Sequence, residues 1–89
     1  MKIIKTASAG TLESSDILVT VQPADILKLE LESPVLAQYG EQIEETVRTV
    51  LTDLGVKAGL ITLQDQGALD CTIRARLETA VRRGAEQEV

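Results

Sequence analysis

The chain has 89 residues, of which 44% are hydrophobic but only 1% aromatic, so aliphatic side chains must fill its core. This length has room for one hydrophobic core, and we expect a single domain over residues 1–89. The net charge of −5 repels polyanions, and one tyrosine without phenylalanine or tryptophan cannot form the aromatic platform on which bases stack, so we expect no nucleic-acid partner.

The first residues and the single cysteine indicate the cellular compartment in which the protein is found. "MKIIKTASAG" has an apolar run of only Ile3 and Ile4, too short for a secretory signal. Cys71 has no partner for an intrachain disulfide, which is typical of a reducing compartment. We therefore expect a cytoplasmic protein with no membrane partner.

The first predicted elements are two strands that form a hairpin. Small and β-branched residues predict a strand over Ala7–Glu13, and Ile17–Gln22 alternates apolar and polar residues with the strand period of two. We expect Ser14 and Ser15 to form a two-residue turn between them. Glu13 and Asp16 would then be the last positions of the ladder.

A third strand follows Pro23, which ends the second because proline has no N–H for a ladder. In "ILKLELE", residues 26–32, leucines alternate with charged residues, so this strand should have one buried and one solvated face. "GLITLQ", residues 59–64, predicts a fourth strand.

Two amphipathic helices are predicted, over residues 33–55 and 65–84. In the first, Ser33 should be the N-cap, Pro34 the first helical residue, and Gly55 the C-terminal stop. We expect residues 85–89 to be a frayed tail. Apolar stripes at helical spacing predict the buried faces, namely Leu36, Tyr39, Ile43, Val47, Val50 and Leu54 in the first helix and Leu69, Ile73, Leu77 and Ala80 in the second.

The predicted order of elements is β-β-β-α-β-α, and each helix is apolar on one side only. This combination favours an α+β fold in which a mixed sheet is covered on one face by two helices. We therefore predict a two-layer α+β sandwich.

The residue types argue against an enzyme that works alone. There is no histidine, so the commonest general base and the commonest metal ligand are both missing, and we expect no catalytic residue and no metal site. The acidic runs are interpreted as solvated helix and strand faces. Cys71 is interpreted as a partly exposed filler residue, and Asp70 as a first-turn acid paired with Arg74.

The stretch "AGTLESSD", Ala9–Asp16, places two adjacent hydroxyls in the predicted turn. Serines in an exposed turn are ordinary, and this is the simplest interpretation of Ser14 and Ser15. A hydroxyl at the tip of a hairpin can also be modified by another enzyme, because no packing has to be undone.

Three blocks of sequence resemble the citrate lyase acyl carrier protein, the gamma chain of that complex. They are "AGTLESSD", "SPVLAQYG" and "GALDCTIRARLE", and the resemblance covers essentially the whole chain. Family members often carry glycine at the position of Ser15, so Ser14 matches the modified serine. The helical acyl carriers differ, because they present the serine of "DSL" at a helix N-terminus, whereas here "ESSD" precedes a strand.

The resemblance implies a carrier that is not itself catalytic. Ser14 would bear 2'-(5''-phosphoribosyl)-3'-dephospho-coenzyme A through a phosphodiester, making the chain a phosphoprotein. The arm would carry acetyl and citryl thioesters while citrate is cleaved to acetate and oxaloacetate during citrate fermentation. The implied partners are the alpha (transferase) and beta (lyase) chains, the holo-acyl carrier protein synthase and an acetylating ligase.

Two other functions stay open. The acyl carrier of malonate decarboxylase resembles this chain in having the same type of arm on a serine before aspartate, although the block "GALDCTIRARLE" favours citrate lyase. The other is a small α+β interaction domain with no covalent group.

Overall fold

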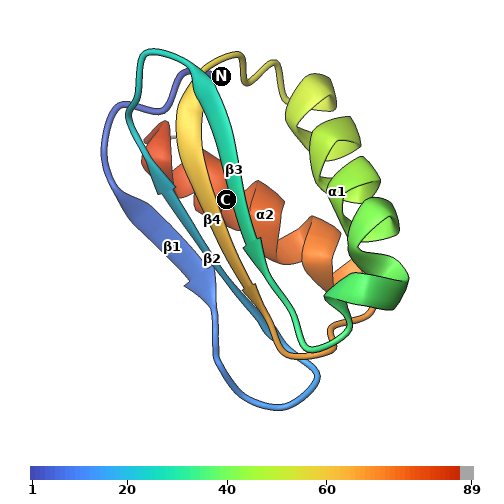
Figure 1. Cartoon of the computed structure of the whole chain (residues 1–89). Coiled ribbons are helices and arrows are strands. Elements are labelled where there is room, and N and C mark those ends of the chain that lie inside the picture. Colours follow the sequence, from blue (N-terminus) through green and yellow to red (C-terminus); the bar gives the residue numbers. More distant parts are fainter. Residues whose placement is uncertain (87–89) are drawn as a thin grey trace.

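The computed structural model describes residues 1–86, and its four strands and two helices follow the predicted order (Figure 1). The elements are β1 (Ala7–Gly10), β2 (Ile17–Gln22), β3 (Leu27–Glu32), α1 (Leu36–Asp53), β4 (Gly59–Asp65) and α2 (Asp70–Gly84). The strands form one sheet in the order β1-β2-β4-β3. β3 is parallel to β4 and the other pairs are antiparallel, so the predicted mixed sheet in a two-layer α+β fold is confirmed.

The alternation of each strand divides the sheet into a covered and an open face. In β2 the side chains of Ile17, Val19 and Val21 are fully buried, whereas the residues between them are only half-buried. In β3 the charged residues are exposed, as predicted, while the leucines are only half-buried because β3 is an edge strand.

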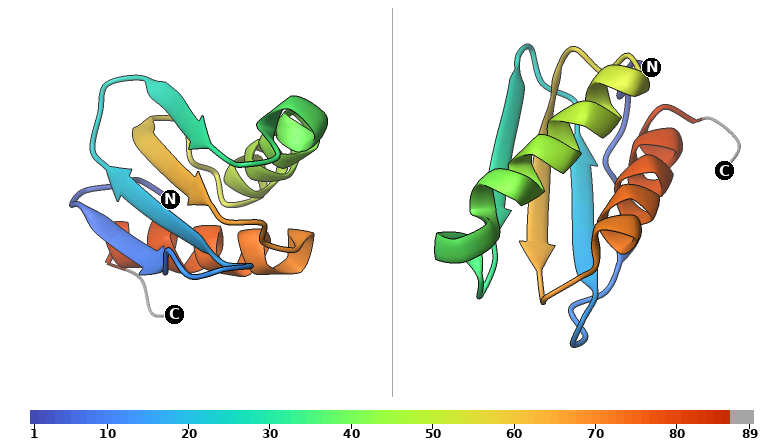
Figure 2. Two further views of the ribbon diagram at one scale, coloured as in Figure 1. Left: turned by 60° about the horizontal axis from the view of Figure 1, so that its bottom comes forward. Right: turned by 90° about the vertical axis from the view of Figure 1, so that its right-hand side faces the viewer.

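Both helices pack on the covered face. α2 contacts β1, β2 and α1, while α1 lies along the β3 side of the molecule (Figure 2). The aliphatic side chains of the strands form one core with residues from both helices, namely Ile43, Val47 and Leu51 of α1 and Ile73 and Leu77 of α2. No helix within residues 1–86 is both long and apolar enough to cross a membrane.

Both helices begin later than the sequence predicts. α1 starts at Leu36, with Val35 as its N-cap, so the assignment of Ser33 as N-cap and Pro34 as first helical residue was wrong. The Ser33 hydroxyl instead bonds Asp65 and the Val35 amide. The second helix was predicted from residue 65, but Asp65 is the last residue of β4 and the helix begins at Asp70.

The helix starts also leave some predicted core residues outside. The first turns of α1 extend beyond edge strand β3, so Leu36 and Tyr39 are exposed (Figure 2). Leu69 is also exposed, because it precedes α2. Gly55 does end α1, with a φ of +69° and an amide that donates to the Thr52 carbonyl. Of the predicted tail, residues 87–89 lie outside the described residues.

The topology brings three connections to one end of the sheet. β1, β3 and β4 all finish there, so the segments that follow them, residues 11–16, 33–35 and 66–69, lie at the same end. We call this the serine end, because residues 11–16 contain Ser14 and Ser15. In Figure 1 it is the lower end of the molecule.

Candidate functional site

The predicted two-residue hairpin turn is replaced by a six-residue loop. β1 ends at Gly10, which pairs with Leu18, so neither Glu13 nor Asp16 is a ladder position. The prediction of a strand reaching Glu13 was therefore wrong. Gly10 has a φ of +96°, a backbone conformation that suits glycine and turns the chain away from the ladder.

Ser14 and Ser15 are nevertheless the central residues of a tight turn within this loop. The Asp16 amide donates to the Glu13 carbonyl across 3.1 Å, which closes a four-residue β-turn. Ser15 has a φ of +65°, so the expected positive φ falls on the second serine. Ser14 is exposed, and its hydroxyl enters none of the hydrogen bonds that order the loop.

The carboxylate of Asp16 orders the loop from within. Its Oδ2 accepts a hydrogen bond of 2.7 Å from the Thr11 hydroxyl, and its Oδ1 accepts one of 2.7 Å from the Ile17 amide. The Thr11 hydroxyl oxygen also accepts a bond from the Glu13 amide. The two ends of the loop are thus joined by side chains where backbone ladder bonds are missing.

Arg76 of α2 binds the same carboxylate with two parallel hydrogen bonds. Its Nε donates to Oδ1 and its terminal nitrogen to Oδ2 of Asp16, each across 3.1 Å. Bidentate arginine–carboxylate contacts hold both groups in one plane and so restrain orientation as well as distance. The loop is therefore attached to the helix beneath the sheet.

These contacts lower the pKa of Asp16 to about 2 from its usual 3.8. The hydrogen bond from Thr11 is the largest cause, followed by that from Arg76 and that from the Ile17 amide. A carboxylate with so low a pKa and both oxygens engaged is a poor proton acceptor near neutral pH. Asp16 therefore positions the turn and is poorly suited to take a proton from a neighbouring hydroxyl.

A second set of contacts ties the turn to the segment after β4. The Ser15 amide donates to the Gln66 carbonyl across 2.8 Å, and the Gln66 amide donates to the Asp16 carbonyl across 2.8 Å. The backbone on the C-terminal side of Ser14 is thus held at two successive residues. The hydroxyl of Ser14 projects from an ordered support while remaining accessible to another protein.

A buried carboxylate that we did not single out from the sequence joins the other two connections. Asp65 is 2% exposed; its Oδ2 accepts a 2.8 Å bond from the Ser33 hydroxyl and its Oδ1 one of 2.9 Å from the Ala68 amide. Ile61, Leu63 and Asp65 share the covered face of β4, so continuing the alternation by one residue would have placed this side chain inside.

The remaining candidates have structural roles or none. Cys71 is exposed, as expected. Asp70 pairs with Arg74 across 2.8 Å, which confirms the predicted ion pair, and it also accepts a bond from the Thr46 hydroxyl. That bond, followed by the one from Arg74, lowers the pKa of Asp70. These contacts join the start of α2 to α1 and involve neither serine.

Comparison with known proteins gives two kinds of relative. The family model ACP, described as the malonate decarboxylase delta subunit (MdcD), matches residues 4–84. The citrate lyase acyl carrier protein of Haemophilus influenzae strain PittEE is 53% identical over 89 residues, which cover 100% of this chain and 94% of that relative. The citrate lyase acyl carrier protein of Streptococcus mutans serotype c is 53% identical over 91 residues, covering 100% of this chain and 89% of its own.

A solved structure has the same fold. A chain in the crystal structure of a Pseudomonas malonate decarboxylase hetero-tetramer in complex with malonate superimposes with a TM-score of 0.76. The match covers 91% of this chain and 84% of the other at 20% sequence identity, so it bears on the fold alone.

Proposed function

Because this chain belongs to the family of citrate lyase acyl carrier proteins, we propose that it is the carrier subunit of a citrate lyase complex. In this role it bears 2'-(5''-phosphoribosyl)-3'-dephospho-coenzyme A on Ser14 and is not catalytic by itself. When attached, this group supplies a thiol that carries acyl groups as thioesters between the alpha and beta chains. The observation that supports the site is the exposed Ser14 hydroxyl on an otherwise hydrogen-bonded turn.

The attachment step needs a nucleophile and a base. In the triphosphoribosyl precursor, the phosphorus next to the ribose is attacked by the Ser14 oxygen. An Oγ–P bond forms, the bond from this phosphorus to the next phosphate breaks, and diphosphate leaves. The proton of the hydroxyl must pass to a base of the holo-acyl carrier protein synthase, since Asp16 is a poor acceptor. The chain therefore contributes the accessible hydroxyl and its orientation.

The turn also suits a carrier after attachment. An arm joined at an exposed turn can sweep toward successive enzyme sites, while the bond from Arg76 to Asp16 and the bond from the Ser15 amide to Gln66 keep its point of attachment in place. Such tethering raises the effective concentration of the arm at each site toward roughly millimolar values. An acetylating ligase would restore the acetyl thioester when it is lost.

Ser14→Ala and Ser15→Ala test the proposal as a matched pair. Both proteins are produced together with the synthase and its precursor-forming enzyme, and intact mass and peptide fragmentation are measured. We expect the mass increase of the arm in wild type and Ser15→Ala, and none in Ser14→Ala. Because both serines are exposed, each change should alter stability by no more than about 0.5 kcal/mol.

The same proteins are then combined with the alpha and beta chains. Citrate cleavage should be lost with Ser14→Ala and kept with Ser15→Ala. An adduct on Ser14→Ala would show that the arm is attached elsewhere. An unmodified wild type, made beside active modifying enzymes, would instead favour a small interaction domain without a covalent group.

A malonate decarboxylase carrier is the second candidate, because the matching family model is described as the malonate decarboxylase delta subunit. The identity of 53% to citrate lyase carriers over the full chain favours citrate. The native complex, purified with this chain, distinguishes them by its substrate. Release of oxaloacetate from citrate supports the first function, and release of carbon dioxide from malonate supports the second.

A further inference from the structure

Large apolar side chains are exposed at the serine end. Leu12 of the same loop is 55% exposed, Leu36 and Tyr39 at the start of α1 are 45% and 51% exposed, and Leu69 before α2 is 70% exposed. All four belong to segments that begin or lie at the serine end. Scattered surface leucines need no explanation, but a group of this kind indicates an interaction surface. Two further large exposed side chains, Ile4 and Ile26, lie at the opposite end.

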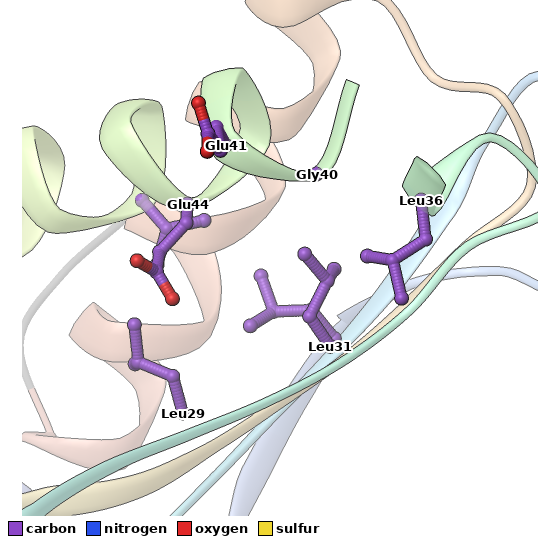
Figure 3. A pocket seen from close by; sticks show the side chains of 8 residues that line it. Leu29, Leu31, Leu36, Gly40, Glu41 and Glu44 are labelled. Carbon is purple, nitrogen blue, oxygen red and sulfur yellow. The ribbon is translucent and has the colours of Figure 1, made fainter. Parts of the chain in front are cut away.

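A hollow of about 370 Å³ adjoins this group, between β3 and the first half of α1. Figure 3 shows Leu29, Leu31 and Leu36 projecting into it, with Glu44 pointing into the space below α1. Glu41 also borders it. An apolar wall next to carboxylates suits a lysine or arginine side chain, whose aliphatic stem packs on leucine while its charged head meets the acids.

The charges of the chain are divided between its two ends. Of the nine basic residues, only Arg74 and Arg76 lie in the half that includes the serine end, and each is bonded to an aspartate. The exposed acids of that half are Glu13, Glu30, Glu32, Glu41, Glu44, Glu45 and Asp70, of which Glu44 is paired with Arg48 and Asp70 with Arg74. The basic residues of the other half are Lys2, Lys5, Lys28, Arg48, Lys57, Arg82 and Arg83, and they outnumber its described acids, Asp25, Asp53, Glu78 and Glu86.

We propose that the serine end is the docking surface for a partner enzyme whose own surface is apolar at its centre and basic at its rim. The apolar group supplies buried contact, and the acids select and orient the partner. The hollow receives one basic side chain beside Glu41, because Glu44 is already paired with Arg48 of the same helix across 3.6 Å. The opposite, more basic end is repelled by the same partner, so that encounters are steered to present Ser14. This inference rests on the proposed function, which requires enzymes to reach Ser14.

The test measures docking without the arm. The probe is the transferase chain of the same complex, and its binding to the Ser14→Ala protein is measured by titration calorimetry. Adding Glu41→Lys at the serine end should weaken binding about fivefold or more at low salt, whereas Asp25→Lys at the opposite end, with the same change in net charge, should not weaken it. Raising the salt should reduce the difference between the two variants.

A second matched pair tests the apolar part. Leu69 and Ile26 are both 70% exposed but lie at opposite ends, so Leu69→Ser should weaken binding and Ile26→Ser should leave it unchanged. Equal affinities of the two charge variants, or of the two apolar variants, would overturn the proposal. It would also be overturned if the transferase chain bound the loaded carrier but not the Ser14→Ala protein. Methyl shifts at Leu29 and Leu31 on loading the arm, without a partner, would overturn the assignment of the hollow to a partner side chain.

Failure of this inference is distinguishable from failure of the proposed function. If wild type acquires the arm but both charge variants bind alike, the carrier role stands and the docking surface is wrong. If wild type never acquires the arm, the carrier role is wrong. Circular dichroism melting of each variant confirms that exposed substitutions have left the fold intact.

Discussion

At the scale of single residues, Asp16 supports the turn more than either serine does. Its carboxylate is reached by a threonine hydroxyl in the loop, the amide of the first residue of β2 and a guanidinium from α2. Its side chain is 14% exposed, whereas the neighbouring serines are exposed to solvent. Hydrogen bonds to an ionised acceptor are stronger than those between neutral groups, so this one residue can order a loop with little apolar packing.

We expect Asp16 to titrate near pH 2, measured from the side-chain carboxyl signal by NMR. Thr11→Val and Arg76→Gln should each raise its pKa toward 3.8, because each removes a donor to the ionised form. Since the folded pKa lies below the unfolded one, the stabilising effect of Asp16 is present above pH 3.8 and is lost as the pH falls through about 2. A titration near pH 3.8 in wild type would contradict the network.

At Ser15 the backbone imposes the requirement. Its φ of +65° is easily adopted by glycine and strained for a β-branched residue, so Ser15→Gly should be tolerated and Ser15→Val should impair attachment of the arm. Labelling by the synthase checks both variants. Equal labelling would show that the turn geometry does not matter to the synthase, and loss of labelling in the glycine variant would place the arm on Ser15.

At the scale of elements, the connection from β1 to β2 depends on a close approach at Gly10. A Cβ on this residue would lie 1.8 Å from the Ile17 carbonyl oxygen, a backbone atom that cannot move without disturbing β2. The glycine therefore brings the two strands together at the base of the serine loop. Gly67, after β4, also has a positive φ of +87°, but a Cβ there would have no neighbour within 4 Å.

Gly10→Ala and Gly67→Ala separate the two effects. Gly67→Ala should lower the free energy of unfolding by about 1–2 kcal/mol, through backbone strain alone. Gly10→Ala carries the same strain and the clash with Ile17, so it should be the more destabilising and should disturb the loop that presents Ser14. Urea denaturation measures the loss of stability in each variant, and amide chemical shifts of residues 11–16 measure the disturbance of the loop. Equal losses of stability in the two variants would show that the contact between the new Cβ and the Ile17 carbonyl oxygen is relieved without a cost in free energy.

At the scale of the whole molecule, stability depends on an aliphatic core shared by every element. Leu77 of α2 is fully buried, as are Val19 and Ile61 of the sheet and, almost completely, Leu51 of α1. A domain of this size buries a smaller share of its surface than a large one and has little stability in reserve. The loss of one such side chain therefore affects the molecule as a unit.

Leu77→Ala should lower the free energy of unfolding by about 2–5 kcal/mol, because it leaves a cavity among aliphatic neighbours. A single cooperative transition, shifted to lower urea concentration, is the expected result. The control is Leu69→Ala, at a residue that is 70% exposed and should change stability by no more than about 0.5 kcal/mol. Similar shifts for the two variants would show that Leu77 is outside the core.

Much of the fold was readable from local patterns. The period of two predicted β2 at its observed bounds and β3 to within one residue, and the stripe of Ile43, Val47 and Val50 predicted the buried face of α1. The predictions that failed lie at the serine end, where β1 stops short and both helices begin late. There the backbone is shaped by side chains from distant positions, such as Arg76 on Asp16 and Ser33 on Asp65.

The sequence by itself determined the elements and their order, the two-layer fold class, the family resemblance and the serine to which it points, because these depend on residue types at short spacings. Only the tertiary structure decided the strand order, the six-residue loop, the role of Asp16 and the gathering of exposed apolar and acidic residues at one end. The physical reason is distance along the chain. Asp16 and Arg76 are 60 residues apart, and no local pattern records a contact that forms only when α2 packs beneath β1 and β2.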